Sequence, residues 1–393
     1  MNGPDVFVVA DNVLSPLGNT TVENFSKLKQ NISGVKLHNQ TAISAKPFYA
    51  SLFGSDESFT NGTKYGYTKF EHLLIASIRG ASKDCQIPLQ DKKTVLIISS
   101  TKGNISLLET GALNAELQKR IALSRSATLV SEYFGFSSQP VIISNACISG
   151  VLAIITGMRL LRSGQYENAV IAGADVISKF ILSGFESFQA LSGQICRPFD
   201  KQRDGLNLGE GAATIIMSTN KKYSKNIRIK GGAVSNDANH ISGPSRTGAE
   251  LAYAIKGALE DAAVLSAEVD FISAHGTATV YNDEMEANAF HLSGLQSVPL
   301  NSLKGYYGHT LGAAGLIESV VSIQSIKENL VLPTLGFKNM GVTQPLNVCT
   351  ELLPGAFNNC LKTASGFGGC NAAVVFGKGF DLHGSDTFLN KNF

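Results

Sequence analysis

The sequence predicts an α/β protein built from two similar layered units. Runs of apolar, β-branched residues alternate with segments whose apolar residues recur at helical spacing, as strands alternating with helices would produce. A strand–turn–helix pattern around Cys147 recurs around His309, which indicates a weak internal repeat. The 393 residues are long enough for two such units, and 44% hydrophobic with 16% charged residues excludes a disordered chain.

The first unit is expected to contain five strands and one central helix. Its strand-like runs are rich in β-branched residues or are apolar almost throughout, as in strands buried on both faces. The helix-like segment carries apolar residues at helical spacing from Val151 to Leu161 and follows the turn at Cys147. We expect strands at 6–10, 95–99, 141–144, 168–177 and 212–217, and a helix at 148–161.

The second unit is expected to vary the same pattern. Strands are expected at 227–234, 271–274, 298–303 and 372–376, with helices at 249–263 and 311–326. The candidate connections between the units are the lysine-rich stretch 221–225 and the loop 236–248. We place the division so that residues 1–240 form the first half and 241–393 the second. The last ten residues are polar and are expected to be loosely ordered.

Composition argues against several classes of protein. With 33 basic and 31 acidic residues, the net charge is +2, so no nucleic-acid partner is expected. No apolar run reaches the roughly 18–20 residues of a membrane span, and the first residues lack a signal-type basic segment, so a cytoplasmic protein is expected. The six cysteines are scattered without CxxC spacing, so neither a metal site nor a redox dithiol is expected.

Cys147 lies between an expected strand and an expected helix, where it could act as a nucleophile. A thiol at a helix N-terminus meets the positive end of the helix dipole, which favours the reactive thiolate. The exposed N–H groups there could also hold an oxyanion. A buried structural cysteine is the alternative, and the local sequence leaves both open.

His275 and His309 each follow an expected strand, at the sheet edge where α/β proteins place their sites. Each alone could be a partly buried histidine with satisfied hydrogen bonds. Together with a cysteine at a third such corner, they suit acyl transfer with a developing enolate, because neutral imidazoles can donate hydrogen bonds to a carbonyl. The glycine-rich run 366–371 could bring backbone N–H groups close to a ligand, or could be a tight turn.

Six blocks in order along nearly the whole chain carry a resemblance to a known family. They are residues 12–19, 145–147, 197–212, 275–286, 304–318 and 366–371. They resemble the β-ketoacyl-acyl-carrier-protein synthases of the elongating, type I/II kind. The resemblance implies a thiolase-like α/β fold, with duplicated βαβαβαββ halves in a layered α-β-α-β-α arrangement. It also implies a homodimer or a heterodimer with a related ketosynthase.

The resemblance also assigns roles around the site. Cys147 would accept an acyl chain, while His275 and His309 would bind a malonyl thioester and stabilise the enolate formed as CO2 leaves. Lys304 would hold the histidine network. The backbone N–H groups of Cys147 and Phe367 would form the oxyanion hole, and the Phe367 ring would act as a gate.

The remaining implied roles concern binding and support. Glu318 would pair with Lys304. No resident cofactor is implied, because the phosphopantetheine arm arrives on an acyl carrier protein. The residues expected to meet that arm are Thr277, Thr279, Ser242, Gly366 and Gly368, and those expected to support the site are Glu318, Asp283 and Asn371. The acidic carrier protein would meet basic residues on or near one helix, Lys64, Lys69 and Arg79, although each could be an ordinary surface charge.

The function implied is a decarboxylative Claisen condensation of an acyl-Cys147 thioester with malonyl-acyl carrier protein. The pathway would be fatty-acid or polyene- and polyketide-type chain elongation. The alternative is a non-catalytic partner subunit that tunes chain length, as a chain-length factor does. The second histidine, His309, argues against a thiolase or a coenzyme A-primed synthase. Departures from the family at Asn145, Ile148, Ser365 and Cys370 leave the acyl substrate open.

Overall fold

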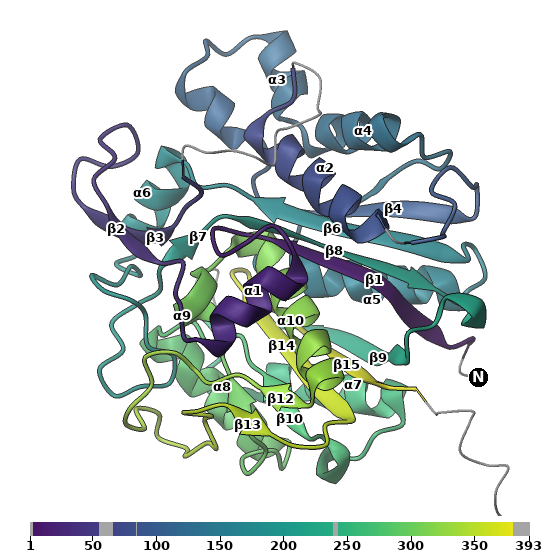
Figure 1. Ribbon diagram of the computed structural model, residues 1–393. Coiled ribbons are helices and arrows are strands. Elements are labelled where there is room, and N and C mark those ends of the chain that lie inside the picture. Colours follow the sequence, from purple (N-terminus) through teal and green to yellow (C-terminus); the bar gives the residue numbers. More distant parts are fainter. Residues whose placement is uncertain (1–2, 55–65, 84, 239–242, 380–393) are drawn as a thin grey trace, which may run out of the picture.

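A ten-stranded sheet runs through the protein. The computed structural model describes residues 3–54, 66–83, 85–238 and 243–379. Within them, the strands of this sheet lie in the order β11-β10-β14-β15-β9-β1-β8-β6-β4-β5. The five strands from the first part of the chain are neighbours in the sheet, and so are the five from the second part (Figure 1).

The two sets of five strands have the same topology. In chain order, each set places its third, second, fourth, fifth and first strand side by side. In both, the second strand runs parallel to the third and fourth, and the fifth is antiparallel to both of its neighbours. This repeat confirms the duplicated halves. The first set is β1 (Val6–Leu14), β4 (Thr94–Ser99), β5 (Val141–Ile143), β6 (Asn168–Asp175) and β8 (Gly211–Ser218), and the second is β9 (Ile227–Asn236), β10 (Phe271–Ser273), β11 (Leu300–Asn301), β14 (Asn359–Gly366) and β15 (Cys370–Lys378).

The halves join where β1 pairs with β9. Only two residue pairs make this ladder, Val6 with Ile229 and Phe7 with Arg228. The first strand of the second set, β9, begins at Ile227, before the expected division between residues 240 and 241. The division at 240/241 stays a prediction.

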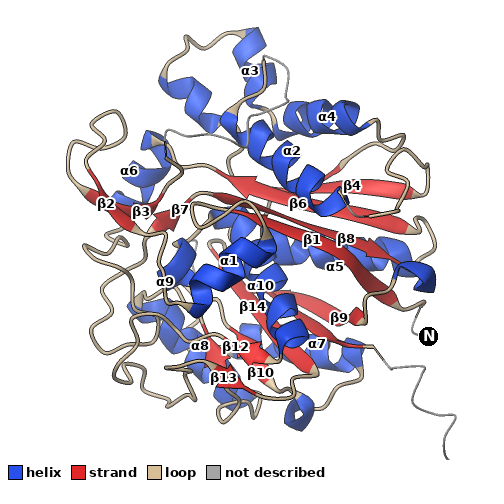
Figure 2. Cartoon of the chain, viewed as in Figure 1, coloured by secondary structure: helices blue, strands red, loops and turns tan. Residues whose placement is uncertain are grey.

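Helices complete five layers. The two central helices, α5 (Ser149–Arg162) and α10 (Ala314–Glu328), pack on each other and against strands of both halves. The outer layers contain α2 (Lys69–Ser82) and α4 (Leu123–Phe134) on the first half, and α7 (Ala249–Ala262) and α8 (Val280–Leu292) on the second. Figures 1 and 2 show α2 and α4 above the first-half strands, and α7 and α8 in the lower part of the molecule with the second-half strands. The predicted α-β-α-β-α arrangement is confirmed.

Smaller elements surround this frame. A three-stranded sheet of order β2-β3-β7 and a two-stranded sheet of β12 and β13 lie apart from the large sheet. In the described part of the chain, every helix is too short or too polar to cross a membrane. The smaller elements are α1 (Thr21–Lys29), β2 (Lys36–His38), β3 (Phe48–Ser51), α3 (Ala115–Ile121), α6 (Lys179–Ser187), β7 (Leu208–Gly209), α9 (Lys304–Tyr307), β12 (Leu330–Val331) and β13 (Leu353–Pro354).

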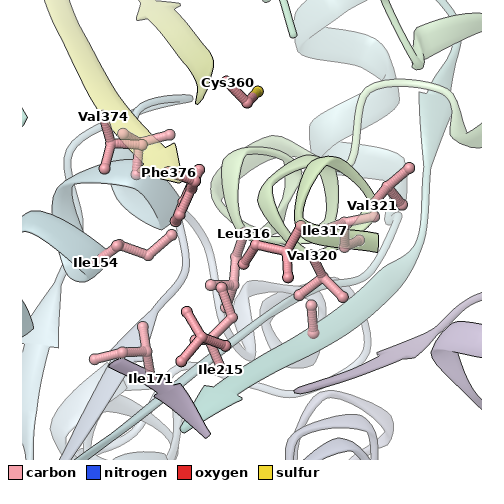
Figure 3. Packing of buried hydrophobic residues seen from close by; sticks show 14 of the residues in the cluster. Ile154, Ile171, Ile215, Leu316, Ile317, Val320, Val321, Cys360, Val374 and Phe376 are labelled. Carbon is pink, nitrogen blue, oxygen red and sulfur yellow. The ribbon is translucent and has the colours of Figure 1, made fainter. Parts of the chain in front are cut away.

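The largest hydrophobic cluster lies around the central helices. Figure 3 shows Ile154 of α5 and Leu316 of α10 between Ile215 of the first half and Phe376 of the second. Burying each such side chain contributes about 1.5–3 kcal/mol. Separate clusters lie under the outer helices of each half, so the strands are packed on both faces, while the central helices belong to the largest cluster.

The expected strands and helices are present, with different ends. The strand expected at 298–303 is reduced to β11, because the Val298 N–H closes a turn on the Leu295 carbonyl and Pro299 has no N–H to donate. The helix expected at 311–326 begins as a 3-10 turn, and α10 itself starts at Ala314. The last ten residues lie outside the described part.

Candidate active site

Cys147 lies in a tight turn between β5 and α5. Ala146 adopts a φ of +43°, in the left-handed region that residues other than glycine rarely occupy. The Ser149 hydroxyl closes the turn, because it accepts from the Asn145 N–H at 2.8 Å and donates to the Ala146 carbonyl at 2.7 Å. The turn therefore holds Cys147 just ahead of the first helical residue of α5.

Both histidines reach the same point from the second half. His275 follows β10, and His309 follows α9, the short helix after β11. The Cys147 sulfur and ring nitrogens of the two histidines all lie within 4.8 Å of one another. The two rings are 5.2 Å apart at their centroids and nearly perpendicular, at 82°. All three side chains are buried, so the two halves share one site.

A cavity of about 460 Å³ opens beside these three groups. The expected arm-binding hydroxyls of Thr277 and Thr279 lie 2.8 Å apart, and both residues line the cavity. Gly366 also lines it, whereas Gly368 is described but is not among the lining residues. Ser242 and Lys64 lie outside the described residues. Other lining residues include Phe185, Phe188, Phe367, Met285, Ser365 and Asn371.

Phe367 lies on the cavity wall and contacts the nucleophile through its backbone. Its ring stacks on Phe185 at 5.9 Å and meets Phe188 edge-on at 5.4 Å. Its N–H donates to the Cys147 sulfur. The preceding Gly366 packs so closely that a Cβ there would lie 2.9 Å from the Cys147 nitrogen. The 366–367 backbone and the Cys147 N–H therefore lie together, as an oxyanion hole requires.

The three reactive groups are uncharged at neutral pH. Burial raises the pKa of the Cys147 thiol to about 12, and the Lys304 charge only partly opposes this. Burial and then the Lys304 charge hold the pKa of His275 and of His309 well below their usual value. The sequence predicted that the helix end would favour the thiolate, but desolvation outweighs that effect at this buried position.

Lys304 and Glu318 form a buried ion pair, as the sequence predicted. The other Glu318 oxygen lies 2.6 Å from the ammonium group of Lys362, on β14. Sequence reasoning missed Lys362, because a lysine in a polar-looking strand gives no sign of burial, yet its side chain has no exposed surface. The only available signal was its place between the apolar Leu361 and the small Ala364.

Two carboxylates of α8 hold the loop that carries His275. Glu286 accepts from the N–H groups of His275 at 2.8 Å and Gly276 at 2.6 Å. Asp283 accepts from the Thr277 N–H at 3.0 Å, and burial raises its pKa to about 7. Asp283 is expected to support the site, and its hydrogen bond to the loop at Thr277 is consistent with that role.

Asn371 and the predicted docking residues also have partners. Asn371 accepts from the Ser365 hydroxyl at 2.7 Å and donates to the Gly369 carbonyl at 3.1 Å, which ties the glycine loop together. Lys69 pairs with Glu210 at 2.9 Å, and Arg79 donates to the Tyr133 hydroxyl. Docking of a carrier protein at Lys69 and Arg79 stays a prediction.

Cys147, His275 and His309 are spaced so that they could hold a metal ion. Two buried ammonium groups, Lys304 and Lys362, both pair with Glu318 in the same network. Both lysine charges act on the two histidines, and a positive potential there opposes a divalent cation and favours an anionic substrate group. The absence of a resident metal stays a prediction.

Known proteins resemble this chain in sequence over most of its length. The chain is 27% identical to 3-oxoacyl-[acyl-carrier-protein] synthase 2 of Vibrio cholerae, over 94% of this chain and 98% of that protein. It is 29% identical to the chloroplastic 3-oxoacyl-[acyl-carrier-protein] synthase I of Hordeum vulgare, over 82% and 75%.

Solved structures agree on the fold. One described as the ishigamide ketosynthase/chain length factor matches with a TM-score of 0.87 at 24% identity, over 96% of this chain and all of the other. A β-ketoacyl synthase from Burkholderia phymatum matches with the same TM-score at 23% identity and the same coverage. The models of the β-ketoacyl synthase N-terminal and C-terminal domains match residues 4–222 and 227–338, so the chain belongs to the β-ketoacyl synthase family.

Proposed function

We propose that the chain condenses an acyl group on Cys147 with malonyl-acyl carrier protein, with loss of CO2. The observation that carries this proposal is the convergence of Cys147, His275 and His309 within 4.8 Å beside a cavity. Two neutral imidazoles and a thiol next to paired backbone N–H groups match the needs of this reaction, in which charge develops on two oxygens in turn.

The first step loads the acyl chain. The Cys147 sulfur attacks the carrier thioester, and its proton passes to a neutral imidazole, because the buried thiol does not ionise by itself at neutral pH. The tetrahedral oxyanion lies between the N–H groups of Cys147 and Phe367. As this intermediate collapses, the carbon–sulfur bond to the carrier breaks and the carrier thiol takes up the proton.

The second step forms the carbon–carbon bond. His275 and His309 donate hydrogen bonds to the malonyl thioester carbonyl. As CO2 leaves, the bond between the α-carbon and the carboxylate carbon breaks, and its electron pair passes into the enolate. The enolate carbon attacks the acyl-Cys147 carbonyl, whose oxyanion lies in the same hole as before. The Cys147 sulfur then leaves as a thiolate and takes up a proton supplied by solvent, which replaces the charge lost with CO2, and the β-ketoacyl chain remains on the carrier.

The wider setting is part of the proposal. The relatives from Vibrio cholerae and Hordeum vulgare are described as 3-oxoacyl-[acyl-carrier-protein] synthases, which favours chain elongation on an acyl carrier protein. The ishigamide match is described as a ketosynthase/chain length factor, so a polyketide-type pathway stands beside fatty-acid synthesis. We propose a cytoplasmic protein that works as a homodimer or with a related ketosynthase.

The test is a panel of acyl carrier proteins offered together with malonyl carrier protein. Mass spectrometry should find acyl groups on Cys147 and β-ketoacyl chains on the carrier, and both should be absent with the Cys147→Ala variant. If no acyl chain is transferred to folded wild-type protein, alone or with a related ketosynthase, the condensing function is wrong. If products form only with a partner and persist with Cys147→Ala, the chain is the non-catalytic subunit.

A further inference from the structure

Lys362 is a second buried cation beneath the site, and the mechanism above gives it no role. It lies on β14, between β10 and β15 in the sheet. Its ammonium group is 2.6 Å from one oxygen of Glu318, whose other oxygen pairs with Lys304. Glu318 is the carboxylate that pairs with both ammonium groups, and Glu286 on α8 also opposes the two cations electrostatically. Because desolvating a buried ammonium group is costly, the presence of Lys362 beside reactive groups points to a use.

The contacts of Lys362 lead directly to the His275 backbone. Its ammonium group donates to the carbonyls of Ser273 and Ala274, at 3.2 Å each. These are the two residues before His275. From the amide side, Glu286 accepts from the N–H groups of His275 and Gly276. The backbone around His275 is therefore held by two groups of opposite charge. The Lys362 ammonium group binds the two carbonyls before His275, and the Glu286 carboxylate binds the N–H groups of His275 and Gly276.

The charge of Lys362 also reaches both imidazoles. It adds to burial and to the Lys304 charge in lowering the pKa of His275 and of His309. The opposing carboxylates are Glu318 on α10, which is engaged by both lysines, and Glu286 on α8, whose pKa burial raises. The other titratable groups of the surroundings include Asp283 on α8, Asp175 at the end of β6, Tyr307 of α9 and the thiols of Cys147, Cys196 and Cys360.

We propose that Lys362 is a positioning residue of the condensing site, which fixes the backbone at His275 and places a positive charge beneath the two histidines. That charge keeps both imidazoles neutral and stabilises the enolate as it forms. The catalytic consequence rests on the proposed function, whereas the effect on the histidines does not depend on any substrate.

The test compares Lys362→Met with Lys362→Arg. Methionine is about as long and removes the charge, and it leaves the Lys304–Glu318 pair electrically balanced, so the protein should still fold. Arginine keeps the charge. The matched control is Lys230→Met, which removes a half-buried lysine bonded to Asn359 at the other end of β14. Lys362→Gln is the second neutral variant, in case the methionine protein does not fold.

Two measurements are made on each variant. Histidine titrations are followed by NMR of ¹³C-labelled histidine without substrate, and decarboxylation of malonyl carrier protein is followed across pH. In Lys362→Met we expect both histidines to protonate about 1 pH unit higher, because a nearby cation no longer opposes the imidazolium. The acid limb of decarboxylation should move to higher pH by the same amount. Lys362→Arg and Lys230→Met should titrate as the wild type does.

The two readouts separate this inference from the proposed function. If the histidine titrations and the acid limb stay in place in both neutral variants, the role of Lys362 is overturned. If the titrations move but the wild type releases no CO2 from malonyl carrier protein, the proposed function fails and the electrostatic role of Lys362 stands. If Lys362→Arg behaves as Lys362→Met does, the charge is not what matters, and the proposal is equally overturned.

Discussion

The two central helices occupy equivalent places in the two halves and differ in what they bring to the site. Each comes after the third strand of its half, α5 through a turn and α10 after α9 and a 3-10 turn, and each has glycine as its second residue, Gly150 and Gly315. Their fifth residues are both buried, but one is Ala153 and the other is Glu318. The first half thus presents a thiol before an apolar helix, and the second presents an imidazole before a charged one.

The glycines explain how two distant corners share one site. A Cβ on Gly150 would lie 2.5 Å from the backbone nitrogen of Leu316, and one on Gly315 would lie 2.7 Å from a methyl carbon of Val151. The helices therefore cross nearly in backbone contact, which brings the turn at Cys147 beside the turn at His309. Duplication supplies the geometry twice, and differences such as Ala153 against Glu318 give the two helices different chemistry.

The largest effect on the rate of condensation should come from removing the Cys147 thiol, which the first half contributes to the site. We expect Cys147→Ala to lower condensation by at least about 10³-fold, because the acyl acceptor is lost. Release of CO2 from malonyl carrier protein should continue, since both histidines remain. Mass spectrometry and CO2 release measure the two steps separately.

Cys85→Ala is the control for this variant, because Cys85 is a partly buried thiol away from the cavity lining. It should retain both activities. Loss of CO2 release in a folded Cys147→Ala protein would contradict the division of labour between the halves.

Removing the imidazole of the second-half corner should affect both steps. We expect His309→Ala to lower decarboxylation and condensation about 10²–10³-fold each, because a hydrogen-bond donor to the developing enolate is lost. The same should hold for His275→Ala. His291→Ala, at the end of α8, is the control and should leave both rates unchanged. A His309→Ala protein that condenses at the normal rate would show that the second half does not hold the malonyl group.

The helix crossing can be tested through stability. Gly150→Ala places a methyl group against the Leu316 backbone, which cannot swing away as a side chain can. We expect the free energy of unfolding to fall by about 1–3 kcal/mol, measured by urea or thermal unfolding. Gly184→Ala in α6 has no heavy atom within 4 Å of the new methyl and should be neutral or slightly stabilising. Equal stability of both variants would show that the crossing is not close-packed.

The sequence predicted these corners better than the charges between them. Strand ends and helix starts are local signals, so the turns at Cys147 and His309 could be placed from β-branched runs and small-residue helical segments. Lys362 could not be placed, because its importance depends on Glu318 from another layer. Asp175 was missed for the same reason: its carboxylate accepts from Ser100 of the first half and from the Gly312 N–H of the second. Such long-range pairs leave no periodic pattern in the chain.

The smallest expected effect is that of the Lys304 charge, in the second half, on the ionisation of the Cys147 thiol, in the first half. Because burial raises the pKa of Cys147 to about 12, its thiolate fraction, and with it the rate of alkylation by iodoacetamide, should rise about tenfold per pH unit from pH 7 to 10. An exposed thiol would level off above its usual pKa of ~8.5. The Lys304 charge lowers the pKa of Cys147, so Lys304→Met should slow alkylation further at every pH in this range. Peptide mapping of Cys147 gives the rate for this residue alone. A plateau near pH 8 would mean that the helix end outweighs burial at this corner, and the contrast between an uncharged nucleophile and the charged network of the second half would then fail.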